Sequence, residues 1–153
     1  MRSLPRLALW ALLMAAASCS EPSHTFNRLP TELPPWVPDI DPIIHTRDGQ
    51  NLRFTAGSFQ PSHIEHCRTD GSRYLTSIFE LRRIQPMGSR ESLCEGSSGT
   101  VLGLYLVFVD RPAEKVTTHC PEGCVVPGGY YPPLGTVVFI PWSEISYIEL
   151  RPQ

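Results

Sequence analysis

The run VLGLYLVFV, at residues 101–109, constrains the fold of this chain more than any other feature of its sequence. Its side chains are apolar at positions that face both sides of a strand, so both sides must be buried. The residues Asp110, Arg111 and Pro112 end the run, because proline cannot donate a hydrogen bond to a neighbouring strand. The run therefore predicts a central β-strand.

Shorter β-prone runs lie on either side of this strand. Within residues 43–54, two such runs are separated by Asp48 and Gly49, and this dipeptide is typical of a tight hairpin. Residues 72–84, SRYLTSIFELRRI, alternate between two faces as a half-buried strand does. Residues 135–150 predict a strand, a tight turn and a second strand.

No stretch between Ile43 and Gln153 has a helical period of more than about two turns. Glycines and prolines are spread through the same region, which disfavours long regular helices. We therefore expect a mostly β domain over residues 43–153, folded as a single small barrel or sandwich.

The segment FIPWSEISYIEL, residues 139–150, resembles the closing segment of small SH3-like and Sm-like barrels. In those barrels a strand ends in a one-turn helix and re-enters the sheet. The resemblance implies a fold class and no activity, because such barrels host many unrelated functions. A faint echo is present earlier: residues 78–84 and 142–148 share the pattern apolar, any, Glu, apolar, any, any, apolar.

The first 18 residues have the layout of an export signal peptide. Arg2 and Arg6 form a basic start, residues 7–17 are uncharged, and small residues follow. A helix of about a dozen residues spans little more than half of a hydrocarbon core about 30 Å thick, so this run is a poor transmembrane helix. We expect residues 1–18 to direct export.

Cys19 directly follows this segment. Residues 16–19, Ala-Ala-Ser-Cys, resemble the lipobox of bacterial lipoproteins, in which small residues precede a cysteine that receives diacylglycerol. The resemblance implies that Cys19 is lipidated and becomes the N-terminus of the mature protein. The alternative is cleavage by an ordinary signal peptidase near Ala17, which leaves a soluble periplasmic or secreted protein.

Residues 19–42 form a proline-rich linker after the lipidated cysteine, with six prolines between Pro22 and Pro42. Such a segment favours the polyproline II conformation, which advances about 3.1 Å per residue and can hold a domain tens of ångströms from its anchor. By resemblance to lipoproteins of enteric bacteria, Ser20 implies an outer-membrane lipoprotein that faces the periplasm.

The mature chain is acidic, which bears on its partners. Removing Arg2 and Arg6 leaves 11 of the 13 basic residues against 15 acidic ones. There is no basic excess that would bind nucleic acid or an anionic membrane surface. The chain also lacks the G-x-S-x-G, H-E-x-x-H, P-loop and dinucleotide motifs. We expect a non-catalytic binding or accessory module without a cofactor, whose partners are the membrane, through the lipid, and another envelope protein.

Four cysteines remain beyond Cys19, and an even number suits pairing in an oxidising compartment. They are Cys67, Cys94, Cys120 and Cys124. Three pairings are possible. We favour Cys67 with Cys94 and Cys120 with Cys124, because each closes a loop between or beside predicted strands.

A metal-binding or redox protein of the envelope is the alternative function. His63, His66 and His119 lie next to cysteines in two predicted loops, HIEHC and HCPEGC, and zinc takes four ligands of these kinds. The redox version is disfavoured, because Cys120 and Cys124 are separated by three residues and not by the two of a thioredoxin-like pair.

Tyr130 and Tyr131 form a candidate binding loop on the Gly- and Pro-rich frame of residues 125–133. Aromatic side chains on constrained loops are frequent contact residues, because they bury a large area at a low entropic cost. The alternative is that both tyrosines cap the core of the barrel.

Overall fold

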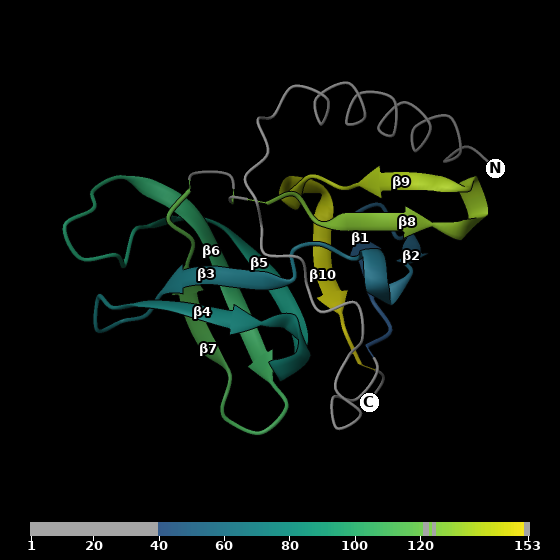
Figure 1. Cartoon of the computed structure of the whole chain (residues 1–153). Helices are drawn as coiled ribbons and strands as arrows, with labels where there is room; N and C mark the ends of the chain where they lie inside the picture. Colours follow the sequence, from purple (N-terminus) through teal and green to yellow (C-terminus); the bar gives the residue numbers. More distant parts are fainter. Residues whose placement is uncertain (1–39, 121–122, 124, 152–153) are drawn as a thin grey trace, which may run out of the picture.

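The computed structural model describes residues 40–120, 123 and 125–151, and these residues form an almost entirely β structure (Figure 1). It contains an eight-stranded antiparallel sheet, a two-stranded sheet and four one-turn 3-10 helices, with no α-helix in the described ranges. The strands are β1 (Ile43–Thr46), β2 (Asn51–Arg53), β3 (His63–Cys67), β4 (Arg73–Ser77), β5 (Leu81–Glu91), β6 (Thr100–Phe108), β7 (Glu114–Thr117), β8 (Gly128–Tyr131), β9 (Thr136–Phe139) and β10 (Ile145–Glu149). The 3-10 helices are η1 (Ala56–Ser58), η2 (Ile78–Glu80), η3 (Pro132–Leu134) and η4 (Trp142–Glu144).

The strand order divides the described structure into two halves of five strands each. The large sheet runs β2-β1-β10-β5-β6-β7-β3-β4, and the small sheet is β8-β9. We call β3 to β7 the middle half, and β1, β2, β8, β9 and β10 the terminal half. The small sheet belongs to the terminal half, because Thr55 and Gln60, which follow β2, form backbone hydrogen bonds with Tyr130 and Gly128 of β8. In Figure 1 the two halves lie side by side.

The two halves repeat one arrangement across the seam where β5 pairs with β10. In each half, the outermost strand (β4 or β9) runs through a 3-10 helix (η2 or η4) into the strand at the seam (β5 or β10). The seam pairs Ile84 with Ile148 and is antiparallel. The carbonyls of Glu80 and Glu144 accept equivalent backbone hydrogen bonds, each 2.9 Å long, from Val109 and Arg47. The two segments with the faint sequence echo are therefore structurally equivalent elements.

Several strand predictions are confirmed. The apolar run at residues 101–109 forms β6, which lies between β5 and β7. Asp48 and Gly49 connect β1 to β2, and Gly49 has a φ of 91°, a value that favours glycine. Residues 135–150 form β9, η4 and β10 in the predicted order.

The prediction of one strand over residues 72–84 is wrong. The 3-10 helix η2 interrupts it, because Ser77 and Glu80 form a capping box at the start of that turn. The turn resets the strand alternation, and Ile78 and Leu81 are consequently both buried. Residues 78–80 have the same pattern, apolar, any, Glu, as the correctly predicted turn at residues 142–144. The sequence therefore contains a local sign of this turn as well.

Two segments predicted as loops contain strands. Residues 63–67 form β3, in which the side chains alternate between exposed and buried up to His66. The candidate binding loop over residues 125–133 contains β8. Its proline and glycine content obscured this short strand.

Both halves contribute to the core, whose buried side chains form one hydrophobic cluster. At the seam, Ile84 and Ile148 are completely buried. Fully burying one such side chain contributes on the order of 1.5–3 kcal/mol. The seam is therefore part of the hydrophobic core.

The described residues form no helix that is long and apolar enough to span a membrane.

Candidate functional site

Two of the predicted site cysteines are joined in the structure. Cys67, at the end of β3, forms a disulfide with Cys94, which follows β5, and both residues are buried. This is the pairing that we favoured. A disulfide of this kind indicates an oxidising, extracytoplasmic location. Cys120 is also disulfide-bonded. Cys124, its expected partner, and the lipidation site Cys19 lie outside the described residues.

The three histidines of the alternative metal site do not converge. His63 and His66 are both on β3 but lie on opposite faces of the strand, because their positions differ by an odd number. His63 is exposed, whereas His66 is buried. His119 lies 3.8 Å from the carboxylate of Glu65, on the outer face. In the part of the chain that the structure describes, no group of three or more His, Cys, Asp or Glu side chains is placed to hold a metal ion.

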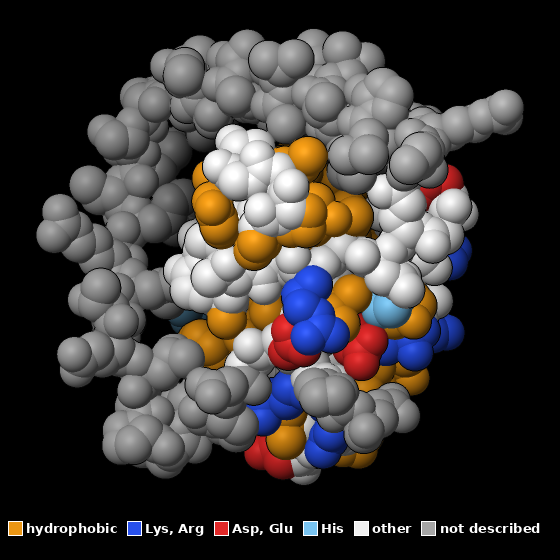
Figure 2. Space-filling model, turned by 90° about the vertical axis from the view of Figure 1, so that its right-hand side faces the viewer, with side chains coloured by type: hydrophobic (Ala, Val, Ile, Leu, Met, Phe, Trp, Pro, Cys, Tyr) orange, Lys and Arg blue, Asp and Glu red, His pale blue; other side chains and the backbone are white. Residues whose placement is uncertain are grey.

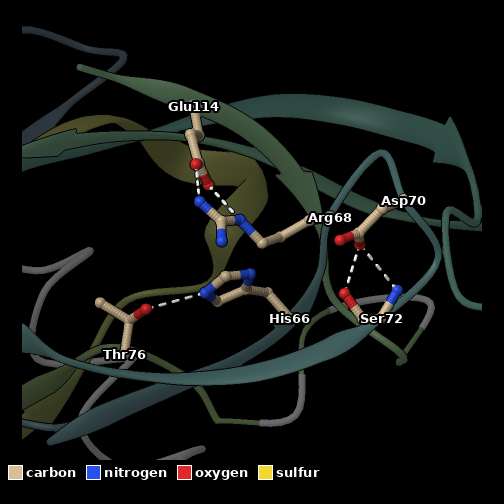
Figure 3. Close-up of polar contacts among 6 residues, drawn as sticks. All are labelled: His66, Arg68, Asp70, Ser72, Thr76 and Glu114. Atoms are coloured by element: carbon tan, nitrogen blue, oxygen red, sulfur yellow. Dashed lines mark hydrogen bonds and ion pairs between the residues drawn. The ribbon is translucent and has the colours of Figure 1, made fainter. Parts of the chain in front are cut away.

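His66 instead belongs to a polar cluster inside the middle half (Figure 3). Its Nε2 atom lies 2.8 Å from the hydroxyl oxygen of Thr76 on β4, and its Nδ1 atom is buried with no hydrogen-bond partner among the described residues. Burial, together with the positive charges of Arg68 and Arg111, lowers the pKa of His66 to about 4. The ring is therefore neutral at pH 7.

Arg68 acts on this histidine as a nearby positive charge, and it links the end of β3 to β7. Its guanidinium donates two hydrogen bonds to the carboxylate of Glu114, and the Nε–Oε2 distance is 2.8 Å. The same guanidinium lies 4.5 Å from the ring centroid of Tyr74 on β4. Paired in this way, Arg68 and Glu114 tie the β3–β4 hairpin to the neighbouring strand.

The candidate binding loop forms the β8–β9 hairpin, and its two tyrosines have different roles. Tyr131 is half-buried, and its ring centroid lies 5.6 Å from that of Phe54, so it packs against the core. Tyr130 is 40% exposed. Its backbone is held by Ser58, whose hydroxyl accepts a 2.7 Å hydrogen bond from the Tyr130 amide. The hairpin thus presents Tyr130 on a rigid support.

This hairpin is unusual in its charge and its exposure. Residues 125–143 contain no charged side chain. The exposed residues at and near the tip include four with apolar or aromatic side chains, Tyr130, Pro132, Pro133 and Val137, beside Gly135 and Thr136. These four form the candidate contact surface. In Figure 1 this hairpin lies in the upper part of the described structure, and Figure 2 shows hydrophobic side chains gathered at the same height. Most of the visible arginine and carboxylate atoms lie below them. We call these four residues the hairpin patch.

Glycine allows η1 to approach the hairpin closely. A Cβ atom at Gly129 would lie 2.8 Å from the carbonyl oxygen of Ser58, a distance that real Cβ atoms essentially never show. The close contact between Gly129 and Ser58 therefore requires glycine at this position. It places the bracing hydroxyl of Ser58 beside the amide of Tyr130.

Comparison with known proteins gave no relative. No family model, curated protein or solved structure matches this chain.

The sequence interpretation missed the cluster around His66. One signal was present, because Ile64 and His66 alternate with His63 and Glu65 in HIEHC, as in a strand with one buried face. No local signal announces the pairing of Arg68 with Glu114, because these residues are 46 positions apart.

Proposed function

We propose that this protein is a bacterial cell-envelope lipoprotein, attached to the outer membrane on its periplasmic side through an acylated Cys19. It acts there as a non-catalytic binding module. The observation that carries the proposal is the buried Cys67–Cys94 disulfide. It suits the oxidising compartment to which an export signal would deliver the chain, and it takes up two of the five cysteines.

Replacing Cys19 by serine is expected to release the protein from the membrane, because serine cannot form the thioether to diacylglycerol. The wild-type chain should sediment with the outer-membrane fraction, and its intact mass should match a chain that starts at Cys19 and carries acyl groups. The Cys19→Ser protein should be found in the soluble periplasmic fraction. Ser18→Ala is the matched control, because it keeps a small residue before the cysteine and should remain on the membrane.

Two results would contradict the lipid anchor. The first is a wild-type protein that is soluble and carries no acyl mass, which would favour ordinary cleavage and a soluble periplasmic or secreted protein. The second is a Cys19→Ser protein that stays with the membrane as fully as the wild type.

The hairpin patch supports the binding role. Protein interfaces are enriched in tyrosine and depleted in charged residues at their centres, and the patch has this composition. Because Ser58 and Phe54 hold the hairpin in place, little conformational entropy is lost on contact. The partner is another envelope protein that presents an uncharged surface, since burying an unpaired charge is costly.

His66 is not placed to act as a catalytic group in the closed structure. His66 has a large pKa shift, which is often a mark of active sites. Its ring is, however, almost completely closed off from solvent, so a substrate would not reach it.

Replacing Tyr130 by aspartate is expected to weaken the complex with the partner by about thirtyfold, corresponding to about 2 kcal/mol for an interface hot spot. Cross-linking in the envelope, followed by purification and quantitative mass spectrometry, measures the amount of partner recovered. Leu75→Asp is the matched control, because Leu75 is 65% exposed on β4 and lies outside the patch. Equal recovery with both variants would remove the patch from the proposal.

We also propose that each half of the structure is a small barrel of the SH3-like or Sm-like kind. The support is that the element on which the resemblance depends, a strand that passes through a 3-10 helix into another strand, is present twice. In each half this element connects the outermost strand, β4 or β9, to the strand at the seam, β5 or β10. This fold proposal implies no activity of its own.

A further inference from the structure

The β3–β4 hairpin is attached to the rest of the sheet over a short length only. On one side, β4 is the last strand of the sheet. On the other side, β3 joins β7 through one residue pair, Cys67 with Thr117. Near the same end, the Cys67–Cys94 disulfide and the ion pair of Arg68 with Glu114 also hold the hairpin. The Glu95 amide donates a hydrogen bond to the carbonyl of Gly71 in the β3–β4 turn, and His119 lies 3.8 Å from Glu65. Along β3 itself, the buried side chain of Ile64 packs in the core.

Close to this attachment lies His66, a buried histidine whose surroundings do not accommodate a second proton on the ring. His66 is 2% exposed, and its Nδ1 atom has no acceptor among the described residues. In the protonated ring both nitrogens are donors, so Nδ1 would need an acceptor and the ring would carry a buried positive charge. Thr76 on β4 offers only a hydroxyl, which already contacts Nε2.

The charged groups around His66 also oppose protonation. Arg68, just after β3, and Arg111, in the turn after β6, both act on the ring as positive charges. The carboxylate of Glu114 on β7 is already engaged by both guanidinium hydrogen bonds of Arg68. Tyr74 on β4 contributes a ring whose centroid is 6.1 Å from that of His66. No carboxylate in this cluster is left to compensate an imidazolium.

We propose that the β3–β4 hairpin is an acid-released flap: when His66 takes up a proton, the ring leaves its buried position and the hairpin separates from β7, while the Cys67–Cys94 disulfide keeps it tied. Separation exposes the edge of β7, Glu114 to Thr117, to solvent. Free strand edges are sites where an extended segment of another protein can add. The flap depends neither on the lipid anchor nor on the hairpin patch.

The direction of the pH effect follows from the lowered pKa. Above the ordinary pKa of 6.5, the ring is neutral in both the closed and the open flap, and the closed state is fully favoured. As the pH falls from 6.5 toward 4, the open state takes up the proton more readily than the closed state, so the closed state loses stability. At pH 5, the opening equilibrium should rise by about thirtyfold.

Hydrogen exchange measured on the disulfide-intact mature chain at pH 7.5 and pH 5 tests the flap. After correction for intrinsic exchange rates, the amides of β3 and β4 should open about thirtyfold more at pH 5, while those of β5, β6, β8 and β9 stay unchanged. His66→Gln has no titrating ring and should abolish the increase. His45→Gln is the matched control, because His45 is half-buried on β1 and contacts Glu149 outside the cluster.

Three outcomes would overturn the flap: a uniform increase in all strands, an equal local increase in His66→Gln, or no increase in the wild type. The His66→Gln comparison also separates the contribution of His66 from that of His119, which lies 3.8 Å from Glu65 on β3. If His66→Gln does not fold, NMR titration of the His66 ring in the wild-type protein tests the flap instead. Ring protonation that coincides with amide exposure in β3 and β4 supports the flap, and protonation with the hairpin still protected excludes it.

Discussion

Replacing Cys67 and Cys94 together by alanine is expected to lower the free energy of unfolding by about 3.5 kcal/mol. The disulfide joins residues 27 positions apart, and in the chain-entropy model a cross-link over such a loop removes this much freedom from the unfolded chain. The place of the disulfide in the sheet adds to this loss of stability. Because β3 pairs with β7 through one residue pair, the disulfide is the covalent tie that holds the β3–β4 hairpin in place.

Urea denaturation of the double variant and of the wild type, each with and without a reducing agent, measures this effect. The reduced wild-type protein should lose at least as much stability as the double variant. The wild-type midpoint should shift on reduction, and the midpoint of the variant should shift less, since only the disulfide at Cys120 remains to be reduced. Equal midpoints for the oxidised wild type and the double variant would show that the disulfide contributes nothing to stability.

The parts of the fold that the sequence predicts are those with a local cause. A strand buried on both faces must be apolar at every position, and so residues 101–109 identify β6. The Asp48-Gly49 turn and the strand after Trp142 are likewise determined within a few residues. The capping box of Ser77 and Glu80 was also a local signal, but the strand alternation of its neighbours masked it.

The pairing of β5 with β10 has no such local cause. The contact between Ile84 and Ile148 joins segments far apart in the chain, and an alternating strand fits many partners equally well. The sequence does carry a trace of it, because the two echoing segments end at these two isoleucines. Seven residues of similar pattern indicate equivalent elements only after the strand order is known.

In the candidate sites, too, the features with a local cause are visible in the sequence, and those that depend on distant residues are not. The charge-free composition of the β8–β9 hairpin is visible in the sequence, and it identifies Tyr130 and Tyr131 as a pair. Which of them is available for contact depends on Phe54, whose ring packs against Tyr131 from a distant part of the chain. The burial of His66 depends in the same way on Arg68, Glu114 and the disulfide.

Replacing Ile148 by alanine is expected to lower the free energy of unfolding by about 2–5 kcal/mol. Ile148 is fully buried at the seam, opposite Ile84, and truncation leaves a cavity between two paired strands that can relax only partly. Ser146→Ala is the matched control, because Ser146 is exposed on the same strand and its replacement should change stability by about 0.5 kcal/mol or less. Denaturant titration measures both.

The double variant Ile84→Ala/Ile148→Ala tests whether the seam joins the two halves into one cooperative unit. Since the two side chains share one space, the second truncation enlarges an existing cavity, and the combined loss should differ from the sum of the single losses by about 0.5 kcal/mol or more. Both halves should unfold in one transition, because their buried side chains form one cluster. Strictly additive losses, together with separate transitions for the two halves, would show that the halves fold independently and that the seam is only a contact between them.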